Sequence, residues 1–100
     1  MSDRQDILNL WRFPYTQHGG VTLVARSDAA ECVRRILAGQ YQFLGYDSFT
    51  LSTEGWIQPH MEWSPDWSRS GAPQFGDILA QLEGHPASVT HYEFVFRERP

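Results

Sequence analysis

Residues 19–39 read GGVTLVARSDAAECVRRILAG, and this stretch decides the fold. Its first part, Val21 to Ala25, is apolar and β-branched behind a Gly-Gly turn, which predicts a buried strand. Its second part carries apolar residues at helical spacing, which predicts an amphipathic helix. That apolar stripe consists of Ala29, Cys32, Val33, Ile36 and Leu37. A buried strand followed at once by a helix indicates a domain that mixes both kinds of element.

Both ends of the predicted helix carry their own signals. Ser27 and Asp28 are good N-cap residues, and Glu31 three positions after Asp28 fits a capping box. Glu31 also lies four residues before Arg35, a spacing that forms weak ion pairs on a wet helix face. Gly39 is expected to end the helix in the left-handed conformation.

The rest of the chain divides by the same rules. We expect strands at Tyr41 to Ser52, Trp56 to Trp63 and Val89 to Arg97, and a second helix at about Gln74 to Glu83. The apolar stripe of that second helix is Phe75, Ile78, Leu79 and Leu82. The first of these strands should break near Gly45 or Asp47, and Pro59 places the second at an edge. Residues 6–15 fit a helical turn and a strand face equally well.

The resulting order is strand, helix, strand, strand, helix, strand. It predicts an α+β fold of the ferredoxin-like, split βαβ type (βαββαβ), with an antiparallel sheet and two helices on one face. The strand order expected for that fold is 4-1-3-2. Residues 1–100 are expected to form one domain, in which residues 21–97 are the core and residues 1–20 are an N-terminal extension and turn.

Composition bounds the class of protein. With 100 residues, 41% hydrophobic and 14% aromatic, the chain has enough apolar surface for one core. Its net charge of −4 disfavours binding to nucleic acid or to anionic membranes. All eight basic residues are arginine. Cys32 is the only cysteine, which excludes a disulfide framework and indicates an inert core thiol. With no signal-peptide pattern and no long apolar run, we expect a cytoplasmic protein.

Two His-x-Glu pairs, His60-x-Glu62 and His91-x-Glu93, are candidates for metal binding or proton transfer. In the order 4-1-3-2, however, their strands are separated by the strand of Val21 to Arg26. Two inter-strand steps place them about 9–10 Å apart, which is long for one shared coordination shell. We therefore predict no metal site and no cofactor, and we interpret the pairs as part of a solvated sheet face.

A small-ligand pocket on the open sheet face is a second hypothesis. It would be formed by Arg26, Trp56, Gln58, His60 and His91. Arginine and imidazole side chains converging there would suit an anionic small molecule. Packing of arginine on tryptophan explains the same residues equally well.

Residues 56–69 are the main compositional oddity, because they carry three of the four tryptophans. The loop Ser64 to Pro73 is long for a compact domain, which favours a role in binding. Trp and Arg are the residues that dominate binding hot spots. The predicted partner-binding residues are Trp63, Asp66, Trp67 and Arg69. Of these, Trp63 is also expected to reach the core. Trp67 is expected to be exposed as a binding anchor, and the alternative is that it folds back over the edge of the core and the loop is a lid without a partner.

The sequence identifies no family. Val21 to Arg26 and Leu44 to Tyr46 are loosely similar to stretches in small dimeric α+β barrels, in which two ferredoxin-like units pair sheet to sheet. This resemblance carries over no catalytic residue. The first functional hypothesis is a small accessory, regulatory or inhibitory module that binds another protein through the Trp-rich loop. The alternative is a dimeric barrel, paired through the open sheet face, that binds a small ligand or acts as an enzyme.

Overall fold

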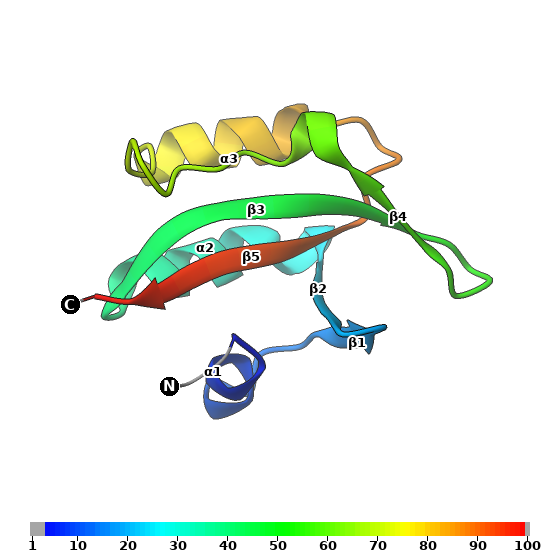
Figure 1. Cartoon of the computed structure of the whole chain (residues 1–100), viewed down its shortest axis with the longest axis horizontal. Coiled ribbons are helices and arrows are strands. Elements are labelled where there is room, and N and C mark those ends of the chain that lie inside the picture. Colours follow the sequence, from blue (N-terminus) through cyan, green and yellow to red (C-terminus); the bar gives the residue numbers. More distant parts are fainter. Residues whose placement is uncertain (1–3, 100) are drawn as a thin grey trace.

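The computed structural model describes residues 4–99, a mixed α and β chain (Figure 1). Its helices are α1 (Arg4–Leu10), α2 (Ala29–Ala38) and α3 (Phe75–Gly84), with short 3-10 turns η1 (Arg26–Asp28) and η2 (Met61–Trp63). Its strands are β1 (Thr16–His18), β2 (Val21–Ala25), β3 (Tyr41–Leu51), β4 (Ile57–His60) and β5 (His91–Glu98). The α+β class is therefore confirmed.

The five strands form one sheet in the order β1-β2-β5-β3-β4, and every neighbouring pair is antiparallel. The antiparallel sheet is as predicted, but a ferredoxin-like fold is not confirmed. The predicted order 4-1-3-2 would place β2 between β5 and β4. In the structure β5 lies between β2 and β3 instead, so the predicted strand order is wrong. The reason is that β3 and β5, the two longest strands, pair along almost their whole length.

The first strand and helix form where the sequence places them, but the helix ends differ from the prediction. Asp28 makes no side-chain cap, and Glu31 instead pairs with Arg34 and with Arg35, whose Nε lies 2.9 Å from Glu31 Oε2. These arginines lower the pKa of Glu31 to about 2. Gly39 is extended, with φ −85°, so the left-handed stop is wrong. A Cβ at Gly39 would lie 2.9 Å from the Tyr41 ring. The glycine is therefore explained by the close approach of this ring to the backbone.

One hydrophobic core lies between the sheet and helices α2 and α3. The apolar stripes predicted for both helices pack into it. Strand β5 contributes to the same core a buried row that consists of Tyr92, Phe94 and Phe96. Strand β3 contributes Phe43 and Tyr46. Cys32 is fully buried there, and burial raises the pKa of its thiol to about 12, so it is an unreactive core residue.

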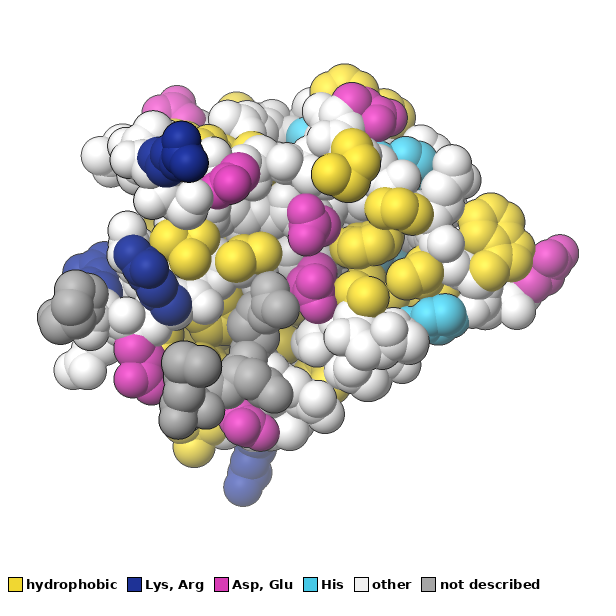
Figure 2. Space-filling model, viewed as in Figure 1, with side chains coloured by type: hydrophobic (Ala, Val, Ile, Leu, Met, Phe, Trp, Pro, Cys, Tyr) yellow, Lys and Arg dark blue, Asp and Glu magenta, His cyan; other side chains and the backbone are white. Residues whose placement is uncertain are grey.

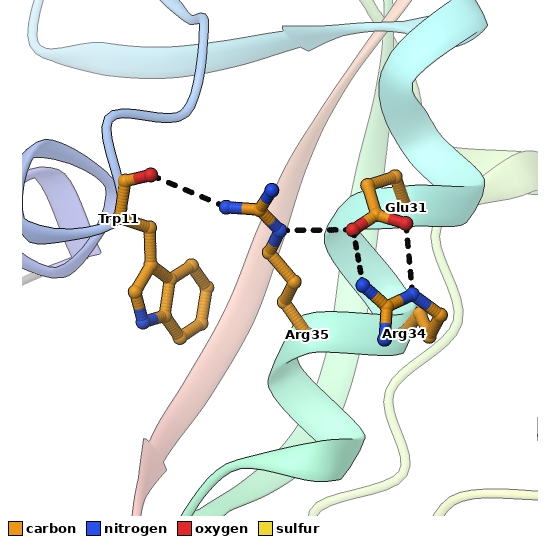
Figure 3. A network of polar contacts seen from close by, with 4 residues as sticks. All are labelled: Trp11, Glu31, Arg34 and Arg35. Carbon is orange, nitrogen blue, oxygen red and sulfur yellow. Dashed lines mark hydrogen bonds and ion pairs between the residues drawn. The ribbon is translucent and has the colours of Figure 1, made fainter.

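The N-terminal segment forms a helix, α1, followed by the short strand β1. Arg35 ties the segment to α2, because its Nη1 donates to the carbonyl of Trp11 at 3.2 Å while its Nε donates to Glu31 (Figure 3). The Arg35 guanidinium also lies over the Phe13 ring, 5.3 Å from its centroid. Phe13 is buried. The segment is therefore part of the folded domain.

The sheet is curled, so that its two outer hairpins approach each other. The imidazole Nε2 of His18, at the end of β1, contacts the carbonyl of Gly55 in the β3–β4 turn. Leu23 explains the direction of the curl. Its side chain is on the face without helices, yet it is fully buried. The hairpins must therefore bend toward that face, which makes it concave.

Truncation of the core should separate fully buried from partly buried positions. We expect Ile36→Ala to lower the free energy of unfolding by about 2–5 kcal/mol, because the lost methylenes leave a cavity in a packed core. Leu79→Ala should cost less, since Leu79 is only partly buried. Urea denaturation measures both. Equal effects, or no effect of Ile36→Ala, would contradict the core described above.

Candidate functional site

Strand pairing assigns each side chain to one of two sheet faces. Residues directly opposite each other on neighbouring antiparallel strands share a face. One row is Val24, Tyr92, Ser48 and His60, on the face that α2 and α3 cover. The next row is Ala25, His91, Phe49 and Pro59, on the opposite face. No helix of residues 4–99 packs on this second face, and we call it the open face.

The two His-x-Glu pairs do not meet. His60 is on the helix-covered face and His91 is on the open face. His60 Nε2 lies 2.6 Å from Thr50 Oγ1, and its Nδ1 is 3.8 Å from Glu62. The strand that separates the pairs is β3, not β2 as predicted. The described residues contain no group of three or more His, Cys, Asp or Glu side chains that would hold a metal ion.

Arg26 does not turn to the open face as predicted, because its guanidinium closes the C-terminal end of α3. It donates to five backbone carbonyls at 2.7–3.4 Å, and its own N–H bonds to Thr90 O. These carbonyls belong to Leu82, Glu83, His85, Pro86 and Val89. A fork of guanidinium donors satisfies the helix-end acceptors that would otherwise lack partners. Arg26 is thus separated from His91, and the five proposed pocket residues do not converge.

The Trp-rich loop is fastened to a bulge in β3. The register of β3 with β5 shifts between Phe43 and Gly45, where the sequence predicted a break. Tyr46 N then donates to Pro65 O at 3.2 Å, and Trp67 N donates to Leu44 O at 2.7 Å. Gly45 has φ +141°, and a Cβ there would lie 2.2 Å from Pro65 O. Only glycine permits this contact.

The same contacts turn Trp67 inward. Its ring lies edge-on to Phe43 and Tyr46, with centroids 5.6 and 5.9 Å apart, and is partly buried against the core. The predicted exposure of Trp67 is therefore wrong. Trp63 packs against the core, as expected. Asp66 accepts a bond from Ser68 N, which lowers the pKa of its carboxyl, and Arg69 is exposed. The four predicted partner-binding residues thus divide into two inward and two outward side chains.

His85, which the sequence did not single out, borders a cleft of about 430 Å³ between η2 and the end of α3. The buried Tyr46 hydroxyl lies 2.7 Å from His85 Nε2, and the His85 ring packs on Trp63 at 5.3 Å. Burial raises the pKa of Tyr46, so its hydroxyl stays protonated beside the imidazole. Burial, and then the charge of Arg26, lower the pKa of His85. The only sequence signal was a histidine directly after a helix end.

An apolar patch remains on the open face. Its members are Leu51, Ile57, Pro59 and Val95, together with Met61, the first residue of η2 directly after β4, and we call them the open-face patch. Met61 is 75% exposed, and Trp56 in the adjoining turn is 50% exposed. Figure 2 shows hydrophobic side chains gathered over the β3–β4 side of this face. Large apolar groups normally gain by leaving water, so a contiguous exposed group indicates an interaction surface.

Carboxylates lie beside this patch along β3 and β4, whereas Arg97, two residues after Val95 on the same face, is bonded to Gln42. Between positions 47 and 66 the chain carries four carboxylates and no Lys or Arg. Asp47 lies directly opposite Glu93 on the open face, where two like charges repel each other. Glu93 accepts a bond from Thr22 N, but no described Arg forms an ion pair with either carboxylate. On the face that Figure 2 shows, the basic side chains, in dark blue, lie away from this patch.

Comparison of the chain with protein-family models, curated proteins and solved structures finds no match. Within residues 4–99, no helix has both the length and the apolar character that crossing a bilayer requires.

Replacement of Trp67 tests its inward position. We expect Trp67→Ala to lower the free energy of unfolding by about 2 kcal/mol or more, because the ring leaves a gap against Phe43 and Tyr46. Trp56→Ala, which removes a half-exposed ring, is the matched control and should change stability little. Similar small effects of both substitutions would mean that Trp67 is not packed as described.

Stability should fall as the pH is lowered from 8 to about 5.5. Burial lowers the folded-state pKa of His85 and of His91 below their unfolded value of 6.5, so the unfolded chain binds more protons in this window. Stability is then lost below about pH 6.5 as the unfolded histidines become protonated. The double variant His85→Gln/His91→Gln should flatten the profile obtained by urea denaturation. An unchanged slope would refute this assignment.

Proposed function

We propose that the protein is a protein-binding module that uses the open-face patch to contact a partner. The observation that carries the proposal is a sheet with one face covered by helices, whose other face carries partly exposed apolar side chains along β3 and β4 beside two opposed carboxylates. A sheet face with apolar side chains is normally buried against another layer. A partner protein would supply the missing layer.

The composition of the surface supports this proposal. Met and aromatic side chains are enriched in interfaces, and Trp56 and Met61 are two of the three large hydrophobics that the described residues expose. The third, Leu10, is at the end of α1 and is 77% exposed. The backbone of Trp56 bonds to Ser52, and its ring makes an exposed contact from Nε1 to Glu54, so the half-exposed ring can pack on a partner.

The charge pattern specifies the partner's chemistry. An apolar patch beside the opposed carboxylates Asp47 and Glu93 favours a partner surface that is apolar at its centre and carries Arg or Lys. Such a partner would relieve the repulsion between these two groups. The binding residues proposed from sequence contribute differently. Trp63 and Trp67 pack against the core, whereas Asp66 and Arg69 are exposed, and Asp66 lines a groove beside Val95.

A second copy of the chain is the alternative occupant of the open face. Two sheets would then pair face to face, as in the dimeric α+β barrels. In a twofold dimer, however, the same patch of each copy would face its counterpart, so carboxylates would meet carboxylates. The partner of opposite charge is therefore the better match. An accessory, regulatory or inhibitory role acting through contact fits this surface.

The test compares two charge substitutions at exposed hydrophobic positions. Immobilised protein is used to capture binding proteins from a lysate of its own cells, and the captured set is quantified by mass spectrometry. Met61→Glu should abolish capture of the specific partner, because a charge would be buried at the interface. Leu10→Glu should leave capture unchanged, since Leu10 is remote from the patch. Capture by the unaltered protein should also weaken with added salt.

Two outcomes would overturn the proposal. Equal capture by Met61→Glu and the unaltered protein would show that the open-face patch is not the binding surface. Sedimentation showing a dimer that Met61→Glu dissociates would identify a second copy, and not a basic partner, as the occupant.

A further inference from the structure

We propose that the partner places a basic amphipathic helix across the open-face patch and does not add a strand to the edge of the sheet. This inference rests on the proposed function and specifies the partner's structure. It follows from three features of the chain: the chemistry of its strand edges, the accessible part of the open face and the position of its carboxylates.

The outer edge of β4 cannot accept a continuous strand. Phe49 O accepts a bond from Thr90 N, so the polar backbone groups of Phe49 point toward β5. Phe49 and Pro59 are therefore a pair without mutual hydrogen bonds, and the Pro59 nitrogen faces the outer edge. An added strand would need donors at Ile57 and at Pro59. Proline has none, which is a common protection of edge strands.

The opposite edge is equally unsuited. Strand β1 has only three residues, which offers few sites for an incoming chain. The side chain of its last residue, His18, contacts the carbonyl of Gly55 across the open end of the sheet. Because both edges are closed in this way, a partner is directed to the face between them.

The part of the open face that stays accessible lies along β3 and β4. The curl buries Leu23 and Phe49 on the same face, whereas the open-face patch remains partly exposed. A groove of about 330 Å³ beside it, between β3 and the loop after η2, is lined by Val95 and Pro65 together with polar groups such as Asp47 and Asp66. A helix is a convex cylinder about 10 Å across, and its apolar stripe would cover the patch much as α2 covers the other face.

The carboxylates lie where the flanks of such a helix would pass. Asp47 and Asp66 border the groove, and Glu93 lies opposite Asp47 on the same face. Arg or Lys beside the apolar stripe of the helix would reach these carboxylates. Charges at the rim of an interface mainly set the orientation of the bound partner and the rate of association. An acidic amphipathic helix would be repelled by the same groups. The recognised element is therefore a helix that is apolar on one side and basic around it.

Three synthetic peptides of about 18 residues, long enough to form a helix, test the inference. The first has Leu and Lys at helical spacing, the second replaces Lys with Glu, and the third has the first peptide's composition in strict alternation. Binding is measured by titration calorimetry at physiological salt. The basic helical peptide should bind at least about tenfold more tightly than the other two.

Three variants locate the binding. Ile57→Glu should lower the affinity for the basic helical peptide at least about tenfold, and Leu10→Glu should not change it. Pro59→Val restores a donor at the β4 edge. Because Pro59 also belongs to the open-face patch, this variant is judged by the ranking of the peptides within it, and the basic helical peptide should still bind more tightly than the alternating one. Tighter binding of the alternating peptide, above all in Pro59→Val, would show strand addition and overturn the inference.

The two proposals fail in different ways. If none of the peptides binds while capture from the lysate still depends on Met61, the inference of a helical partner is wrong and the proposed binding surface is retained. If capture does not depend on Met61, the binding surface is wrong. If the acidic helical peptide binds as tightly as the basic one, the charge assignment is wrong and the inference fails.

Discussion

The close approach of Pro65 to Gly45 is the constraint on which most of this structure depends. A side chain at position 45 would overlap the Pro65 carbonyl, so only glycine lets the loop after η2 lie against β3. Two backbone bonds then hold the loop along the part of β3 that β4 does not reach. The bulge at the same place shifts the register of β3 against β5, as bulges do where a strand bends.

That constraint divides the Trp-rich segment into two parts with different tasks. After η2 the chain is pulled onto β3, and Trp67 packs on Phe43 and Tyr46. In the turn before β4 and at the first residue of η2, Trp56 and Met61 stay in solvent beside the open-face patch. Burial of the first part contributes stability, and exposure of the second leaves a surface for a partner. The fold and the proposed binding site thus follow from one local geometry.

The sequence predicted those features that depend on local periodicity. The spacing of Ile36 and Ile78 gave both helices and their buried sides, and Gly45 marked the break in its strand. The strand order depends on which long strands pair. Alternation of apolar and polar side chains indicates which face of a strand is buried, but it does not indicate which strand lies next to it. For the same reason the polar neighbours of Trp67 misled the prediction of its exposure, because a contact with a distant strand decides it. The position of Arg26 was also missed, because its guanidinium binds backbone carbonyls at the end of α3, which is distant in the sequence.

Quenching of single-tryptophan variants tests this division most directly. Two proteins are made, each with three of the four tryptophans changed to phenylalanine, so that only Trp56 or only Trp67 emits. Acrylamide is the quencher because it is uncharged and does not respond to the nearby carboxylates. The account predicts a quenching constant for Trp56 severalfold above that for Trp67, since one ring is half exposed and the other packs on the core. Equal quenching of both would contradict it.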